Sequence, residues 1–173
     1  MKKDFIMPIL VLTAICLIIS GTLAVVNNLT SPVIEAAAAE RAENARKEII
    51  PEADEFIALE LNELPETIAE AYVTANNTGF IFIVNVNGYG GEIKIICGID
   101  PDGRIIKSSV LSHSETQGLG TIVFDRAVDY EGADKNLEGI DLIAGSTITS
   151  SAYRLAIIYA FEAFEIVGGL NNE

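Results

Sequence analysis

Residues 80–111 read FIFIVNVNGYGGEIKIICGIDPDGRIIKSSVL, and this stretch decides the fold. Its segments 80–86, 92–99 and 104–111 are rich in β-branched and aromatic residues, which favour strands. The sequences NGYGG and DPDG that separate these segments are typical of tight turns. Because tight turns join antiparallel neighbours, the stretch predicts three consecutive strands of an antiparallel meander.

Helices are predicted before and after this meander. Residues 32–50, PVIEAAAAERAENARKEII, begin with Pro, contain strong helix formers and are followed by Pro51, so they predict one helix. Residues 121–130 predict a short helix, and residues from about 150 to 167 predict a longer one. The longer helix is expected to present one apolar face, made of Ala152, Leu155, Ala156, Tyr159, Ala163 and Ile166. Strands grouped in the sequence, with helices set apart from them, indicate an α+β domain.

The N-terminal region contains an apolar segment that predicts a transmembrane helix. Residues 5–26, FIMPILVLTAICLIISGTLAVV, run without a charged side chain and are long enough, at ~1.5 Å per residue, to cross a ~30 Å hydrocarbon core. A cleaved signal peptide is the alternative, but its apolar region is usually about 7 to 15 residues and ends in an A-x-A-like site, which is missing here. Cys16 follows Ile15 where a lipoprotein acceptor would follow a small residue.

The charges around this segment predict its orientation. Lys2 and Lys3 precede it, and the next basic residue is Arg41, so the positive-inside rule places residues 1–4 in the cytoplasm. We therefore expect a single-pass protein of the cell membrane with its C-terminal part outside the cytoplasm. In this scheme residues 27–55 are a helical connector.

Composition narrows the classes of function. A net charge of −14 argues against nucleic-acid binding, because phosphate contacts need clustered Lys and Arg. Cys16 and Cys97 have neither CxxC spacing nor a histidine partner, so no metal site is predicted. With 173 residues, the chain has room for one folded domain beyond the apolar segment.

Two segments combine glycine with hydroxyl side chains. Residues 113–120, HSETQGLG, follow the last predicted strand, and residues 141–151, DLIAGSTITSS, open the long helix. Taken alone, the first is better explained as a strand-to-helix turn and the second as a helix cap. A helix start also offers unpaired N–H groups to a phosphate, so a ligand remains an alternative for both. A hydrolase nucleophile is not predicted, since His113 is the only histidine and G-x-S-x-G is absent.

In combination, these segments resemble a known family. The order of GYGGEI at 88–93, ID-x-DG at 99–103, HSETQGLG at 113–120 and AGSTITS at 144–150, after one N-terminal anchor, is similar to the covalent flavin-binding domain. That domain is found in the G subunit of Rnf ion-translocating electron-transport complexes and in the C subunit of the sodium-pumping quinone reductase. The resemblance implies an extracytoplasmic FMN-binding domain at residues 56–173.

The resemblance also implies a site. In the family, a motif similar to D-x-x-[ST]-G-A-T carries FMN, esterified to its last Thr by a dedicated flavin transferase. Asp141, Gly145 and Thr147 match that motif. Ala144 stands where the motif has Ser or Thr, and Ser146 stands where it has Ala, so each departure exchanges one small residue for another. Gln117 stands where the family usually has Pro. The cofactor-binding residues implied are Thr147 as the covalent FMN acceptor, with Gly145, Ser146, Thr149, Ser150, Glu115, Thr116, Gly118, Leu119 and Gly120.

The function implied is that of an electron-carrier subunit in a Rnf-type complex, which couples electron transfer between ferredoxin and NAD to Na⁺ or H⁺ movement. The chain is not expected to be catalytic alone. Its implied partners are the other membrane subunits and the flavin transferase. The C subunit of the quinone reductase is one alternative, and a membrane-tethered binding module without covalent flavin is another.

Overall fold

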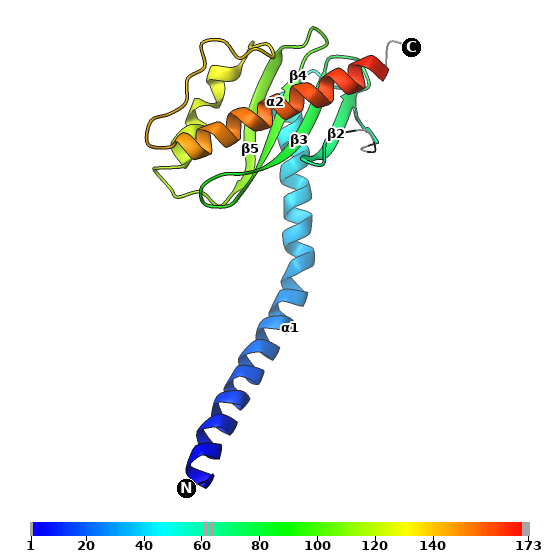
Figure 1. Cartoon of the computed structure of the whole chain (residues 1–173). Coiled ribbons are helices and arrows are strands. Elements are labelled where there is room, and N and C mark those ends of the chain that lie inside the picture. The colour runs from blue at the N-terminus through cyan, green and yellow to red at the C-terminus, as the bar shows by residue number, and fades with distance from the viewer. Residues whose placement is uncertain (1, 61, 63, 171–173) are drawn as a thin grey trace. The chain divides into compact units, whose positions relative to one another are not determined.

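The computed structural model describes residues 2–60, 62 and 64–170, which form two units divided between Arg41 and Ala42 (Figure 1). Residue 1 of the predicted cytoplasmic segment 1–4, and residues 61, 63 and 171–173 of the predicted domain 56–173, lie outside the described residues. The elements in chain order are α1 (Lys2–Ile49), β1 (Phe56–Ala58), β2 (Ile68–Thr74), β3 (Phe80–Asn87), β4 (Glu92–Ile99), β5 (Ile105–His113), the 3₁₀ helix η1 (Thr121–Tyr130) and α2 (Thr147–Leu170).

The first element, α1, is one continuous helix of 48 residues. It includes the predicted transmembrane segment 5–26 and the predicted helix 32–50 as far as Ile49, so no break in the helix separates anchor from connector. Pro32 lies inside it, although a proline removes one backbone hydrogen bond. The hydroxyl of Thr22 donates to the carbonyl of Ile18 at 2.8 Å, which satisfies this polar group within the apolar helix.

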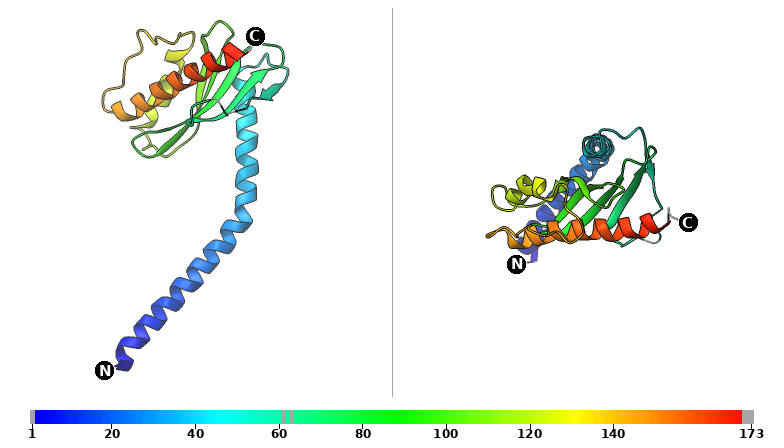
Figure 2. Two further views of the ribbon diagram at one scale, coloured as in Figure 1. Left: turned by 45° about the vertical axis from the view of Figure 1, so that its right-hand side comes forward. Right: turned by 90° about the horizontal axis from the view of Figure 1, so that it is seen from above.

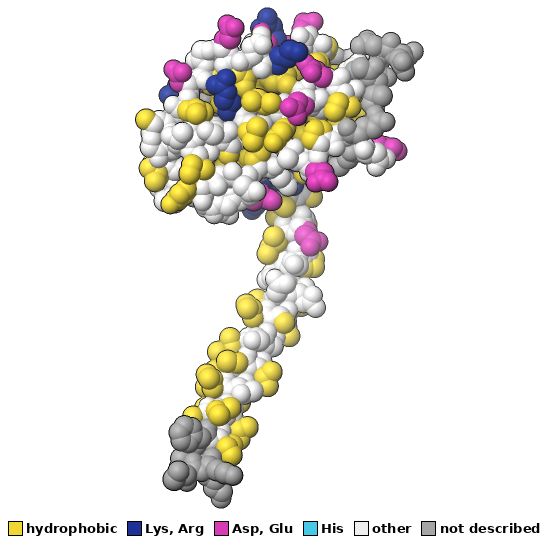
Figure 3. Space-filling view, in the orientation of Figure 1, with side chains coloured by type: hydrophobic (Ala, Val, Ile, Leu, Met, Phe, Trp, Pro, Cys, Tyr) yellow, Lys and Arg dark blue, Asp and Glu magenta, His cyan; other side chains and the backbone are white. Residues whose placement is uncertain are grey.

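The large apolar side chains of α1 between Ile6 and Ile34 are exposed. The part Ile6–Ile49 is long and apolar enough to cross a membrane, and none of its most apolar stretch is buried within the chain (Figure 3). An exposed apolar surface of this length needs a nonpolar solvent, as a lipid bilayer provides.

The sheet has five strands in the order β1-β2-β3-β4-β5, all antiparallel neighbours. The predicted meander is confirmed as β3, β4 and β5, and η1 occupies the predicted short helix. The strands β1 and β2 were not predicted. The first has only three residues, and the second, IAEAYVT, mixes β-branched residues with Ala and Glu, which have weak strand preference.

On one face of the sheet lies α2, which crosses β3 and β4 and covers the main core (Figures 1 and 2). Its predicted apolar face is partly wrong, because Leu155 is 41% exposed while Tyr153, Ile157 and Phe161 are buried. The helix is apolar around more than half of its circumference, so its sequence alone does not fix which part of that arc faces the sheet. The α+β architecture itself is confirmed.

The end of α1 covers the other face of the sheet (Figure 2). Ile49 and Ile50 are buried against a second cluster of isoleucines, Ile81, Ile83 and Ile96. Gly98 leaves room for this contact, since a Cβ there would lie 2.3 Å from Cγ2 of Ile49. The last turns of α1 therefore belong to the folded domain.

Candidate functional site

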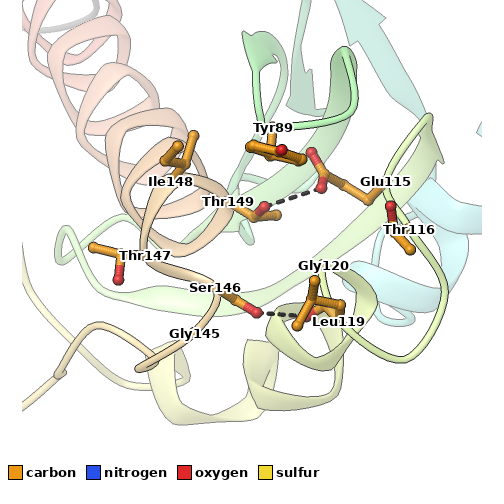
Figure 4. Close-up of a pocket in the computed structure, with 10 residues that line it drawn as sticks. All are labelled: Tyr89, Glu115, Thr116, Leu119, Gly120, Gly145, Ser146, Thr147, Ile148 and Thr149. Carbon is orange, nitrogen blue, oxygen red and sulfur yellow. Dashed lines mark hydrogen bonds between the residues drawn. The ribbon is translucent and has the colours of Figure 1, made fainter.

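A cavity of about 420 Å³ opens where the β3–β4 turn, the loop after β5 and the start of α2 meet (Figure 4). Its lining comes from these three segments and includes no Lys or Arg. The lining residues are Tyr89, Glu115, Thr116, Leu119, Gly120, Gly145, Ser146, Thr147, Ile148 and Thr149. Eight of the ten residues that the sequence analysis proposed are among them, and Gly118 and Ser150 are not.

The start of α2 is shaped by Gly145 and Ser146. Gly145 has φ of +85°, a conformation that glycine adopts without the strain a side chain would add. The carbonyl of Ser146 accepts the first bond of the helix, from the N–H of Ser150 at 2.8 Å. The hydroxyl of Ser146 donates to the carbonyl of Leu119, so it ties the helix start to the loop after β5 (Figure 4). Thr147 is then the first helical residue.

The first N–H groups of α2 are available to a ligand. Those of Thr147, Ile148 and Thr149 donate no hydrogen bond to any other residue that the structure describes. The first N–H groups of a helix lack partners within the helix and lie at the positive end of its dipole. This helix start can therefore bind a phosphate although the cavity has no basic side chain.

The four hydroxyl residues between positions 146 and 150 differ in exposure. Ser146, Thr149 and Ser150 are buried, and each has a hydrogen-bond partner. The hydroxyl of Ser150 donates to the carbonyl of Ser146 at 2.9 Å, which explains why Ser150 faces away from the cavity. Thr147 is exposed and lines the cavity. It is the hydroxyl of this group that an enzyme or ligand can reach.

The loop after β5 contributes one buried carboxylate and a more exposed tip. Glu115 is 8% exposed, and its oxygens accept hydrogen bonds from the N–H of Gly90 and the hydroxyl of Thr149, both at 3.0 Å. Thr116 is exposed at the cavity. Gly118, with φ of +78°, turns the tip, and its N–H donates to Thr121 Oγ1 at 2.9 Å rather than facing the cavity.

Three exposed apolar side chains border the cavity. Tyr89 is 72% exposed, Leu119 54% and Ile148 57%, and each comes from a different segment (Figure 4). Apolar groups exposed around a concave site favour a ligand with a large nonpolar surface. The sequence analysis did not propose Tyr89 or Ile148. A tyrosine between glycines in an exposed turn was the available signal for the first, whereas Ile148 could not be told from a core residue of the helix.

Two other residues that were singled out from the sequence do not line the cavity. Asp141 is exposed in the loop before α2. The Nδ1 of His113 accepts a hydrogen bond from the N–H of Glu115 at 3.2 Å, and its ring packs against Phe124 with centroids 4.8 Å apart. Among the described residues, no group of three His, Cys, Asp or Glu side chains is arranged to hold a metal ion.

Comparison with known proteins gives consistent matches. Residues 88–162, which include the whole cavity, match the family model of the FMN-binding domain. The G subunit of the ion-translocating oxidoreductase complex of Shewanella piezotolerans is 31% identical, over 92% of this chain and 91% of that protein. The G subunit of the Na⁺-translocating ferredoxin:NAD⁺ oxidoreductase complex of Acetobacterium woodii is 27% identical, over 90% of this chain and 89% of that protein. Its counterpart in the proton-translocating complex of Clostridium ljungdahlii is 28% identical, over 87% and 86%.

Proposed function

Since the chain belongs to the G-subunit family of ion-translocating oxidoreductase complexes, we propose that it carries electrons in such a complex on an FMN esterified to Thr147. It is a membrane-anchored electron-carrier subunit with an FMN-binding domain. By analogy with the names of its relatives, the electrons pass between ferredoxin and NAD, coupled to the movement of Na⁺ or H⁺. The G-subunit relatives favour this assignment over the C subunit of the quinone reductase.

The attachment site is assigned to Thr147 because this hydroxyl is both exposed and part of the cavity lining. Ser151 is exposed too, but it does not line the cavity. A flavin transferase would move the FMN moiety from a donor to the threonine: the hydroxyl oxygen forms a new bond to the FMN phosphorus, the donor's leaving group departs from it, and the hydroxyl proton is released. This reaction needs a hydroxyl that the transferase can reach. Ser146, Thr149 and Ser150 are buried and paired, whereas Thr147 is exposed at the cavity edge. The motif that resembles the family's attachment sequence ends at the same residue.

The residues of the cavity fit the two parts of FMN. The free N–H groups at the start of α2 would donate hydrogen bonds to the phosphate oxygens, next to the acceptor hydroxyl. The apolar side chains of Tyr89, Leu119 and Ile148 would contact the ring system. When bound, FMN supplies one- and two-electron transfer, and the chain supplies position and shielding from water.

The absence of a basic side chain from the lining explains why a covalent bond is useful. Charge-assisted hydrogen bonds from Arg or Lys would otherwise hold a phosphate strongly. Here the lining offers only uncharged hydrogen-bond donors and the helix dipole. A phosphoester at Thr147 retains the cofactor without them, which suits a domain that faces a dilute compartment.

We assign residues 1–4 to the cytoplasm, 5–26 to the membrane and the domain that follows to the outside of the cell membrane, on the basis of Lys2 and Lys3. The partners proposed are the other membrane subunits of the complex and the flavin transferase. Because α1 is continuous, the connector 27–55 is helical as far as Ile49.

A denaturing gel viewed under ultraviolet light tests the proposal. The full chain, produced with a flavin transferase and exported, should give a band that fluoresces, because only covalently bound flavin survives denaturation. Thr147→Ala should give a dark band, and Thr116→Val, a matched change at another exposed threonine of the cavity, should fluoresce like the wild type. A dark wild-type band, in cells where a known substrate of the transferase fluoresces, would contradict the proposal.

A further inference from the structure

Glu115 lies where the three segments that form the cavity meet. Its side chain is buried, although its neighbours Ser114 and Thr116 are exposed. Oε1 accepts a hydrogen bond from the N–H of Gly90. Oε2 accepts one from Oγ1 of Thr149 (Figure 4). A single carboxylate thus joins the β3–β4 turn to the first turn of α2.

Glycines make room for this carboxylate on two sides. A Cβ at Gly88 would lie 2.1 Å from Oε1 of Glu115, and a Cβ at Gly120 would lie 2.4 Å from Oε2. A Cβ at Gly90 would lie 2.3 Å from the carbonyl oxygen of Ser114. Since Gly88 and Gly90 flank Tyr89, the close approach of the carboxylate and the placement of this ring at the cavity depend on the same turn.

The two hydrogen bonds of Glu115 are of a kind that can hold two segments together. Both oxygens accept a hydrogen bond, as an ionised carboxylate does, and hydrogen bonds to a charged group are roughly twice as strong as neutral ones. An aspartate, one methylene shorter, would not reach both donors. Two segments that are far apart in the sequence, at Gly90 and Thr149, are therefore held together by a side chain from a third.

We propose that Glu115 is a positioning residue, which fixes the turn that carries Tyr89 relative to the helix start that carries Thr147. It thereby sets the width of the cavity between the aromatic side and the attachment point. The identity of the flavin as the occupant rests on the proposed function, whereas the link between the two segments does not. Glu115 acts through Gly90 and Thr149 and needs no contact of its own with the ligand.

Amide hydrogen exchange of the full-length protein in detergent tests the link without any flavin. In Glu115→Ala, the N–H of Gly90 should exchange about tenfold faster than in the wild type, because it loses a bond to a charged acceptor. In Glu115→Gln, it should stay within about threefold, since the amide oxygen still accepts from Gly90 and the amide N–H₂ can donate to Thr149. Glu92→Ala, at an exposed glutamate beside the same turn, is the matched control and should leave the exchange unchanged. Gly88→Ala, which forces the carboxylate to move, should reproduce the effect of Glu115→Ala.

The visible circular dichroism of the attached flavin tests the consequence for the cavity. This signal requires a fixed surrounding of the ring, so it should fall to less than about half in Glu115→Ala and be retained in Glu115→Gln. Unchanged exchange at Gly90 in Glu115→Ala, in a protein whose strand amides stay protected, would overturn the proposal. So would an unchanged dichroism signal in that variant. A wild type without attached flavin would contradict the proposed function instead, while the exchange data would still decide whether Glu115 joins the two segments.

Discussion

Four hydroxyl side chains lie within residues 146–150, at the start of α2. Their hydrogen-bond partners show that they have different roles. Ser146 bonds to the loop after β5, Ser150 to the helix backbone and Thr149 to Glu115. Thr147 alone among them is exposed. Since the four have similar chemistry, exposure rather than residue type decides which one is open to modification.

The buried thiol of Cys97 is expected to make the free energy of unfolding depend on pH. Burial raises the pKa of its thiol from 9.0 to about 12, so the folded chain holds the proton where the unfolded chain releases it. The free energy of unfolding should therefore be unaffected by this group below about pH 9 and should fall as the pH rises toward 12. Urea unfolding of the full chain in detergent, between about pH 8 and 11, measures this fall.

Cys97→Ala is the control for that measurement. Burial also raises the pKa of Tyr130 and Tyr153, so part of the alkaline fall persists in this variant. The thiol's own share, at most about 1.4 kcal/mol per pH unit, should disappear. Parallel pH curves for wild type and variant would show that Cys97 ionises equally in both states.

The position of Tyr89 at the cavity and the hydrogen bonds of Glu115 could not be predicted from the local sequence. The turn that holds Tyr89 was predicted, but its position at the cavity depends on a hydrogen bond to Glu115, which follows 25 residues after Gly90. Local pattern identifies a turn and cannot tell which other loop the turn meets. The resemblance named Glu115 as a flavin-binding residue, and only its buried hydrogen bonds indicate a different role.

Among the elements, the end of α1 packs into the hydrophobic core on one face of the sheet. The stability of a truncated chain should therefore depend on whether this part of α1 is kept. A chain that begins at Ala42 keeps Ile49 and Ile50 on the sheet and should fold as a soluble domain. A chain that begins at Pro51 exposes the isoleucines of β3 and β4 and should be less stable by about 3–6 kcal/mol, given roughly 1.5–3 kcal/mol for each buried isoleucine. Urea unfolding followed by circular dichroism compares the two chains.

Gly98 provides an independent check on the truncations. Gly98→Ala should destabilise the chain that begins at Ala42, because its Cβ would displace Ile49. The same change should cost far less in the chain that begins at Pro51, where Ile49 is absent. Equal costs in both chains would show that the contact between α1 and the sheet does not contribute to stability.

Among the elements, β3, β4 and β5 could be predicted because dense β-branched runs and turn residues agree there. The strands β1 and β2 could not, since their pairing partners rather than their own residues make them strands. The continuity of α1 was also missed. Pro32 suggested a helix start, whereas a helix can continue through a proline at the loss of one hydrogen bond.

At the scale of the whole chain, apolar surface and charge are divided between the two units. Residues 1–41 hold three of the 25 acidic and three of the 11 basic side chains, so the whole net charge of −14 falls on residues 42–173. An acidic domain after an apolar helix suits a protein with one part in lipid and the other in water.

The proposed orientation gives a prediction for the whole chain. A reporter that is active only outside the cytoplasm, fused after Glu173, should be active, because Lys2 and Lys3 favour a cytoplasmic N-terminus. Moving the positive charge, by Lys2→Glu and Lys3→Glu together with basic residues placed after residue 26, should lower that activity. Activity of a cytoplasmic reporter at the same position in the unaltered chain would overturn the orientation.

Peptide mass spectrometry tests most directly whether FMN is bound through a phosphoester to Thr147, as we propose. The chain is exported in the presence of its flavin transferase, digested and fragmented, with Ser146→Ala and Thr149→Ala digested alongside. We expect an added mass of about 438 Da, that of FMN less water, located on Thr147 in the wild type and in both variants and absent from Thr147→Ala. An added mass that persists in Thr147→Ala, or that lies on Thr149 in the wild type, would contradict the proposal.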